Sequence, residues 1–146
     1  MTTPSLAPTR LAVSLDVGTP TTAARRRAGR VLTGVAVLFL LFDTAIKLAG
    51  VKAAVDGTVQ LGYAPHHLPV IAVIELACLV LYLVPRTAPL GAVLFTGYLG
   101  GAVATHLRLD NPLFSHVLFP TYVAALLWGG LYLRDARVRA LLGATR

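Results

Sequence analysis

Four long apolar segments dominate the sequence and restrict its fold more than any other feature. They cover residues 28–49, 68–84, 88–107 and 113–133, and the second, with 17 residues, is the shortest. A helix needs about 20 mostly apolar residues to cross the hydrocarbon core of a bilayer, and about 17 is the lower limit. None of the four carries the polar stripe that a soluble helix shows about every 3.6 residues. The sequence therefore predicts an all-α fold, a polytopic membrane bundle of four helices.

The composition favours the lipid bilayer over nucleic acid as the partner of this chain. Charged residues make up 13% of the chain, yet its formal net charge is +7, whereas soluble domains average about 25% charged residues. Nucleic-acid binders are basic too, but this chain has too few polar residues to cover a soluble surface. Cys78 is the single cysteine, which excludes a disulfide scaffold and a thiol-exchange pair. We expect the lipid bilayer, and no nucleic acid, as the partner.

The arginines predict how the chain crosses the membrane. Ten of them fall on one side of a four-span bundle, namely Arg10, Arg25, Arg26, Arg27, Arg30, Arg86, Arg134, Arg137, Arg139 and Arg146. Cationic residues are retained on the cytoplasmic side during insertion. We therefore expect both termini in the cytoplasm (N-in/C-in), with the protein in a bacterial-type plasma (inner) membrane. Residues 1–27 then form a flexible cytoplasmic tail and residues 134–146 a basic one, flanking a membrane domain over residues 28–133.

The connections between the segments are short. Residues 51–61 lie between the first two segments on the outer side, and we expect them to form a short amphipathic helix on the membrane surface. The turn Pro85-Arg86-Thr87 is so tight that the second and third segments must be antiparallel neighbours.

Several ionisable residues lie inside or at the ends of the apolar segments, where a charge costs about 2.5–3.5 kcal/mol near mid-bilayer. Counting from the outer ends at about 1.5 Å per residue puts Asp43 about 9 Å deep and Glu75 about 10 Å deep. Lys47 follows Asp43 by four residues and shares its helix face. The sequence therefore predicts an intramembrane polar pocket that opens outward, with the candidate residues Asp43, Lys47, Glu75, His106, Arg108 and His116.

A second interpretation of these residues is an ion-pair and hydrogen-bond network that only fixes the helix register. A pocket requires Asp43, Glu75 and His106 to converge within about 6 Å of a common centre, the range over which charges interact appreciably. His106 and His116 are typical of helix-end anchors, and no metal-ligand spacing supports a metal site.

Small residues mark a face of the third segment. Gly97 and Gly101 form a G-x-x-x-G pattern, with Gly100 beside them, and such faces let helix backbones approach closely. We expect this face to pack inside the bundle, with a homodimer interface as the alternative.

A set of short motifs in a fixed order covers about residues 28–140. They are Phe42-Asp43 with Lys47, Leu61-Gly62-Tyr63, Glu75, Pro85-Arg86-Thr87, the run from Gly100 to Arg108, Trp128, and Leu133-Arg134-Asp135. In these motifs the chain resembles the DoxX-like family of small four-helix integral membrane proteins. The wider group takes its name from a membrane subunit linked to a thiosulfate:quinone oxidoreductase, and other members are associated with redox functions.

The resemblance implies a small membrane subunit or accessory protein of a quinone-linked redox system, with a quinone as cofactor and a redox complex as partner. Two alternatives remain open. One is a membrane enzyme or carrier for a small lipophilic ligand that uses Glu75 or Asp43 as acid or base. The other is a structural membrane protein without a ligand, which predicts that no cavity separates the helices.

Overall fold

The computed structural model describes residues 22–141 and 143, and in this part of the chain it contains helices and no strands. The elements, in chain order, are α1 (Thr22–Leu48), α2 (Lys52–Gln60), η1 (Pro65–His67), α3 (Leu68–Leu83), α4 (Ala88–Arg108), η2 (Leu113–Val117), α5 (Phe119–Arg134) and α6 (Ala136–Leu141). Four helical stretches are long and apolar enough to cross a membrane, because η1 extends α3 and η2 extends α5. The all-α fold with four membrane-spanning helices is thereby confirmed.

The helix boundaries follow from familiar sequence signals. α3, α4 and α5 each carry a proline in the first turn, where its missing N–H has no partner to lose. α1 ends at Leu48, just before Gly50, which adopts a φ of 61° that suits glycine after a helix. Residues 22–27 belong to α1 rather than to a flexible tail, since alanine and arginine are good helix formers. The rest of the expected tail, residues 1–21, lies outside the described residues.

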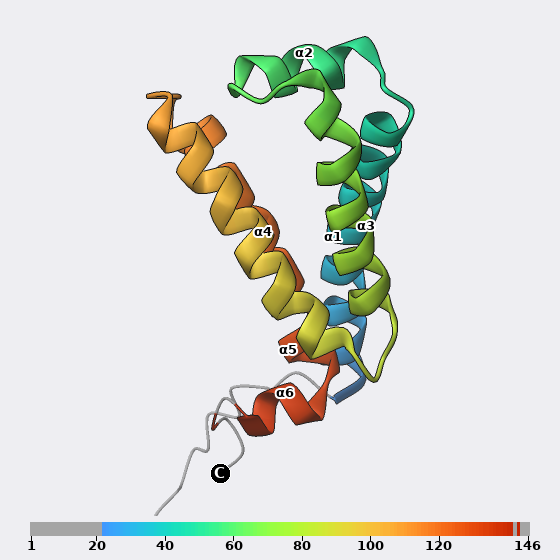
Figure 1. The fold of residues 1–146 in the computed structure, drawn as a ribbon. Coiled ribbons are helices and arrows are strands. Elements are labelled where there is room, and N and C mark those ends of the chain that lie inside the picture. Colours follow the sequence, from blue (N-terminus) through green and yellow to red (C-terminus); the bar gives the residue numbers. More distant parts are fainter. Residues whose placement is uncertain (1–21, 142, 144–146) are drawn as a thin grey trace, which may run out of the picture.

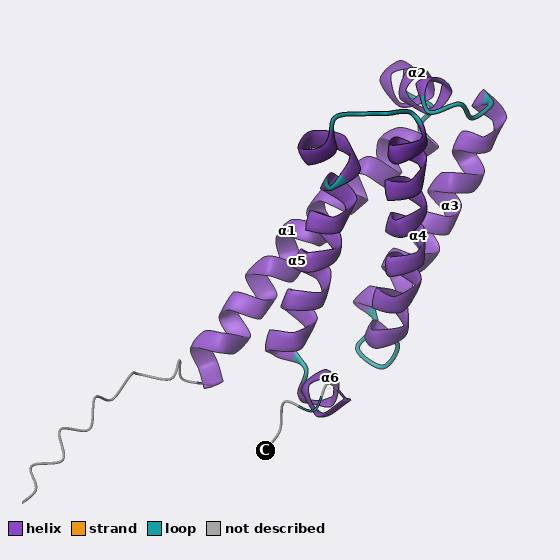
Figure 2. Cartoon of the chain, turned by 90° about the vertical axis from the view of Figure 1, so that its left-hand side faces the viewer, coloured by secondary structure: helices purple, strands orange, loops and turns teal. Residues whose placement is uncertain are grey.

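The four long helices form a ring in the order α1, α3, α4, α5, in which each helix packs on two neighbours. Figures 1 and 2 show this arrangement, with α2 across one end of the bundle and α6 at the other. We call these the α2 end and the terminal end, because α1 begins and α5 ends beside α6. Side chains such as Leu38 and Phe42, 68% and 65% exposed, point away from the bundle, as expected for a surface in contact with lipid.

The helices pack most closely toward the terminal end. The buried core there includes Leu79, Tyr82, Phe95 and Leu127, and the Tyr82 hydroxyl donates a 2.8 Å hydrogen bond to the Leu127 carbonyl. From this end α4 leans away from α1 and α3, so the bundle widens toward the α2 end (Figure 1).

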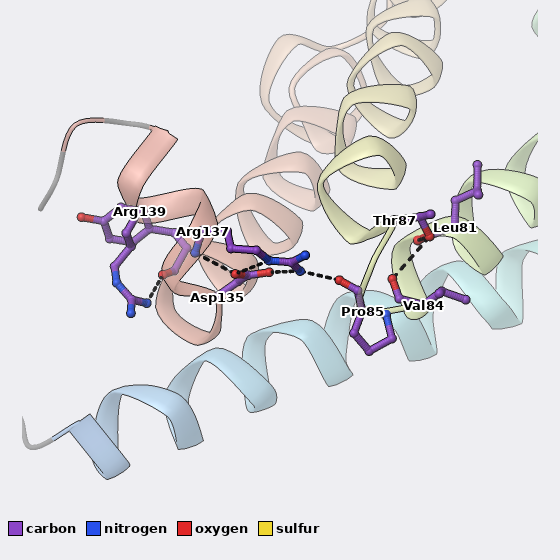
Figure 3. Close-up of polar contacts among 8 residues, drawn as sticks. Leu81, Val84, Pro85, Thr87, Asp135, Arg137 and Arg139 are labelled. Atoms are coloured by element: carbon purple, nitrogen blue, oxygen red, sulfur yellow. Dashed lines mark hydrogen bonds and ion pairs between the residues drawn. The ribbon is translucent and has the colours of Figure 1, made fainter.

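A second small helix closes the terminal end. α6 follows α5 after the single residue Asp135, and its Val138 is 2% exposed. Of the expected basic tail, residues 134–146, Arg134 is the last residue of α5 and Ala136–Leu141 form α6. Residues 142 and 144–146 lie outside the described residues. Arg137 of α6 reaches the carbonyl oxygen of Pro85, in the turn between α3 and α4 (Figure 3). This hydrogen bond connects α6 to the helical hairpin of α3 and α4.

Candidate functional site

A cavity of about 700 Å³ lies at the α2 end, where the helices diverge. Residues of α1, α2, α3, α4, η2 and α5 line it, and most of them are apolar, among them Phe39, Ile46, Ile71, Leu99 and Val123. Sites for small ligands have volumes of about 300–1,000 Å³ and combine apolar walls with a few converging polar groups. The polar side chains on these walls are those of Asp43, Lys47, Thr58, Gln60, Tyr63, Tyr98, Thr105, His106, Asn111 and His116.

Lys47 is the centre of the deeper polar cluster. Its ammonium group donates to Asp43 Oδ2 at 2.5 Å and to Glu75 Oε2 at 2.8 Å. It also lies 3.1 Å from the Tyr98 hydroxyl, which donates in turn to Glu75 Oε2 at 2.9 Å. The cluster thus joins α1, α3 and α4 in the apolar interior of the bundle. Two carboxyl groups share one ammonium, so the fully ionised cluster has a formal charge of −1.

Glu75 is the innermost member of this cluster. Its side chain is 0% exposed, and it lies behind Lys47 and Tyr98 instead of on the cavity wall. Its second oxygen, Oε1, is buried and has no hydrogen-bond partner among the described residues. A buried carboxylate oxygen without a partner costs free energy, so Glu75 depends on Lys47 and Tyr98 for its stabilisation.

A second polar cluster lies nearer the α2 end. His106 and His116 face each other with ring centroids 5.8 Å apart. The side-chain amide nitrogen of Asn111 lies 3.0 Å from His106 Nδ1. Tyr63 and Thr105 form a hydroxyl pair at 3.0 Å. No group of three or more potential metal-ligating side chains occurs within residues 22–141.

A sequence model of the DoxX-like family matches residues 31–130, which is more than half of the chain. The chain belongs to the DoxX-like family. No curated protein and no solved structure matches it. The matched residues of this DoxX-like protein include every residue on the cavity wall.

The structure brings together only some of the six predicted pocket residues of this DoxX-like protein. Asp43, Lys47 and Glu75 meet as expected, because they lie at the same level along the bundle. His106 is eight residues beyond Tyr98, about 12 Å along α4, so it does not share a centre with the acids. The requirement of one common centre is not met, and the cavity, which both clusters line, connects them instead.

Arg108 was predicted to lie in the pocket, but the structure places it outside the cavity. Its guanidinium donates to the Leu61 carbonyl at 3.2 Å at an exposed position, and the residue is absent from the cavity wall. As the last residue of α4 it is directed to the connection after α2, where its charge remains hydrated. The arginine belongs to the outer rim of the bundle and not to the pocket.

The glycine face of α4 is also placed differently from the expectation. Gly97, Gly100 and Gly101 are exposed, and a Cβ added to any of them meets nothing within 4 Å. No helix packs against these glycines as expected, because α4 leans away from α1 and α3 along this stretch and Gly101 lines the cavity instead. Close helix approach occurs instead at other glycines, among them Gly29 of α1 and Gly130 of α5. The alternative, an interface with a second copy of the chain, stays a prediction.

Sequence reasoning missed Tyr98, which contacts both Lys47 and Glu75. One signal could have revealed it. Tyr98, Ala102 and Thr105 follow each other at spacings of four and three residues, which places them on one face of a helix, and all three line the cavity. A tyrosine and a threonine on one face of an apolar segment predict a polar interior surface.

Proposed function

We propose that this DoxX-like protein binds a small lipophilic molecule of the quinone class in the cavity at the α2 end and serves a redox system as a membrane subunit or accessory protein. One observation carries the proposal. The mostly apolar cavity of about 700 Å³ has a lysine ammonium and a tyrosine hydroxyl on its wall. A quinone has matching chemistry, with an apolar body and carbonyl oxygens that accept hydrogen bonds.

The polar clusters suit both redox forms of such a ligand. Lys47 and Tyr98 carry the donors on this wall, and a quinone carbonyl would replace one acceptor that they use within the cluster. The Asp43 carboxylate can accept from a quinol hydroxyl. Reduction of a quinone to a quinol takes two electrons and two protons. The electrons would come from a redox-active partner protein, and the carboxyl and imidazole groups on the wall can exchange the protons.

The arginine distribution supports an orientation for this function. The described arginines at the terminal end include Arg25, Arg26, Arg27, Arg30 and Arg134, whereas Lys52 and Arg108 lie at the α2 end. By the preference of cationic residues for the cytoplasm, the cavity then opens toward the outer side of a bacterial plasma membrane, with both termini inside.

A binding titration tests the proposal. The purified protein in nanodiscs is titrated with a short-chain benzoquinone, and binding is followed by calorimetry. We expect saturable binding that weakens about tenfold in Tyr98→Phe, the effect of losing one hydrogen bond to the ligand or its anchor. Tyr122→Phe is the matched control, because Tyr122 is 47% exposed and lies outside the cavity. Equal binding by the wild type and both variants would contradict the assignment of the ligand to this cavity.

A second candidate is acid–base chemistry on a lipophilic substrate, and the position of Asp43 favours it. Asp43 is on the cavity wall whereas Glu75 is not, so Asp43 is the carboxyl group that can reach a ligand. Under this alternative Asp43→Asn abolishes turnover while ligand binding persists. Under the quinone proposal the same variant binds quinone and loses affinity for the quinol, which donates to the carboxylate.

A further inference from the structure

A smaller cavity of about 260 Å³ lies at the terminal end. The candidate site lies at the other end of the helices, the α2 end. Its wall is formed by Arg30 of α1, the turn residue Pro85, Ala88 of α4, and the corner between α5 and α6 with Arg134, Asp135 and Ala136. Four separate parts of the chain therefore meet around a hollow that contains two arginines.

The acceptors around this hollow are already occupied. Both carboxylate oxygens of Asp135 accept hydrogen bonds from Arg137, and the same guanidinium donates to the Pro85 carbonyl (Figure 3). Arg139 donates to the carbonyl oxygens of Tyr132 and Leu133 at 2.9 and 3.3 Å, which are two of the last carbonyls of α5. The oxygen atoms of this corner are thus hydrogen-bonded to Arg137 and Arg139. Arg134 is close enough to Asp135 to interact with it electrostatically, but it forms no ion pair within the described residues.

Arg134 retains an unused donor. Its Nε is buried and has no hydrogen-bond partner among the described residues, and its guanidinium stacks on the Tyr82 ring with Cζ 5.4 Å from the centroid. Stacking on an aromatic ring holds a guanidinium in place, so the head group of Arg134 is fixed at the wall of the cavity. Ala88, the first residue of α4, brings the positive end of a helix dipole to the same wall.

From this arrangement we infer that the cavity binds a phosphate group, supplied by an anionic phospholipid. Guanidinium groups bind phosphate through charge-assisted, often bidentate hydrogen bonds. The cavity is at the end of the bundle where α1, the α3–α4 turn and α5 leave the apolar segments, which is the level of lipid headgroups. This site is separate from the larger cavity, and the inference does not depend on the proposed function.

Thermal unfolding of the full chain in an uncharged detergent tests this site. Phosphatidylglycerol, phosphatidylcholine and inorganic phosphate are added separately. We expect phosphatidylglycerol to raise the Tm of the wild type and the other two additives to have much smaller effects. The double variant Arg30→Gln/Arg134→Gln should lose most of the increase, with at least about tenfold weaker lipid binding.

The matched control is Arg26→Gln/Arg27→Gln, which removes two exposed arginines of α1 at the same end of the bundle. It should keep the full phosphatidylglycerol effect. Should it lose as much as the first double variant, the lipid would be attracted by general surface charge and the site would be refuted. An equal increase with inorganic phosphate would overturn the assignment to a lipid. If Arg134→Gln prevents folding, the single change at the exposed Arg30 must still weaken the lipid effect.

Discussion

The ammonium of Lys47 lies 2.8 Å from the carboxylate of Glu75 and joins α1 to α3 inside an apolar bundle. Around this pair, Asp43 and Tyr98 complete a cluster that forms part of the wall of the larger cavity. The pair is therefore both a structural link between helices and the deepest part of the candidate site. Substitutions that separate these two roles are the most informative tests of the protein.

We expect Lys47→Met to destabilise the bundle by about 3 kcal/mol, the lower end of the cost of leaving a buried charge unpaired. The variant removes the only cation that contacts Asp43 and Glu75 among the described residues. Thermal unfolding in detergent measures the loss. Lys52→Met is the matched control, because Lys52 pairs with Asp56 in the same four-residue spacing but is 88% exposed.

The stability lost in Lys47→Met should be partly recovered when the carboxyl charges of Asp43 and Glu75 are removed as well. In Asp43→Asn/Lys47→Met/Glu75→Gln no buried charge remains, and replacement of a whole buried ion cluster is often neutral. A triple variant as unstable as Lys47→Met alone would show that lost packing, and not the unpaired charge, causes the destabilisation.

Gly101→Leu should block the larger cavity without unfolding the protein. Gly101 lines the cavity, and an added Cβ meets nothing within 4 Å, so a longer side chain has room to extend into the ligand's volume. We expect quinone binding to weaken at least tenfold while the Tm stays within a few degrees of the wild type. Gly97→Leu, on the same helix and also unobstructed but outside the cavity wall, should bind as the wild type does. Identical binding by both leucine variants would place the ligand elsewhere.

Gly130→Ala should destabilise the contact between α1 and α5 by about 1–3 kcal/mol, the usual cost of overpacking. A Cβ at this position would lie 2.9 Å from the backbone nitrogen of Thr33, and α1 would have to move. Gly97→Ala is the comparison, because it is free of contacts and should be neutral or stabilising by up to about 1 kcal/mol through helix propensity. Chemical or thermal denaturation in detergent compares the two, and equal effects would contradict the close approach of α1 and α5.

The contact between Asp135 and Arg137 should weaken in acid. The hydrogen bond from the Arg137 guanidinium lowers the pKa of Asp135 below its ordinary value of 3.8. A carboxyl group with a lowered pKa in the folded state adds stability above its ordinary pKa, and loses it as the pH falls through the lowered value. The Tm difference between the wild type and Asp135→Asn should therefore be constant at neutral pH and shrink below about pH 4. A difference that does not change with pH would exclude an ionic contribution from this contact.

Position along each segment was predictable because a helix rises by a constant amount per residue. The depths of Asp43 and Glu75 followed from counting, and their meeting on Lys47 agrees with that count. The same counting places His106 too far along α4 to join them, but the sequence did not reveal the cavity that links the two clusters.

Rotation and tilt of the helices were not predictable from the sequence. The glycine pattern of Gly97 and Gly101 indicates a flat helix face. It does not predict whether another helix packs on that face, or which one. In the structure α4 leans away from α1 and α3 along this stretch, and other glycines allow the close packing, among them Gly29, Gly91 and Gly130. Tyr98 was missed for the same reason, since its contact with Glu75 depends on how α4 is turned toward α3.

The sequence by itself determined that four apolar helices are long enough to cross a membrane, that the chain belongs to the DoxX-like family, and that Asp43, Lys47 and Glu75 lie at one level along the helices. Hydrophobic length, short motifs and helical rise are local properties, so they can be read along the chain. Only the tertiary structure decided which charges share a partner, that the bundle opens at the α2 end, and that two arginines meet at the terminal end. These features depend on how four helices are rotated and tilted against one another, which many small packing contacts decide together.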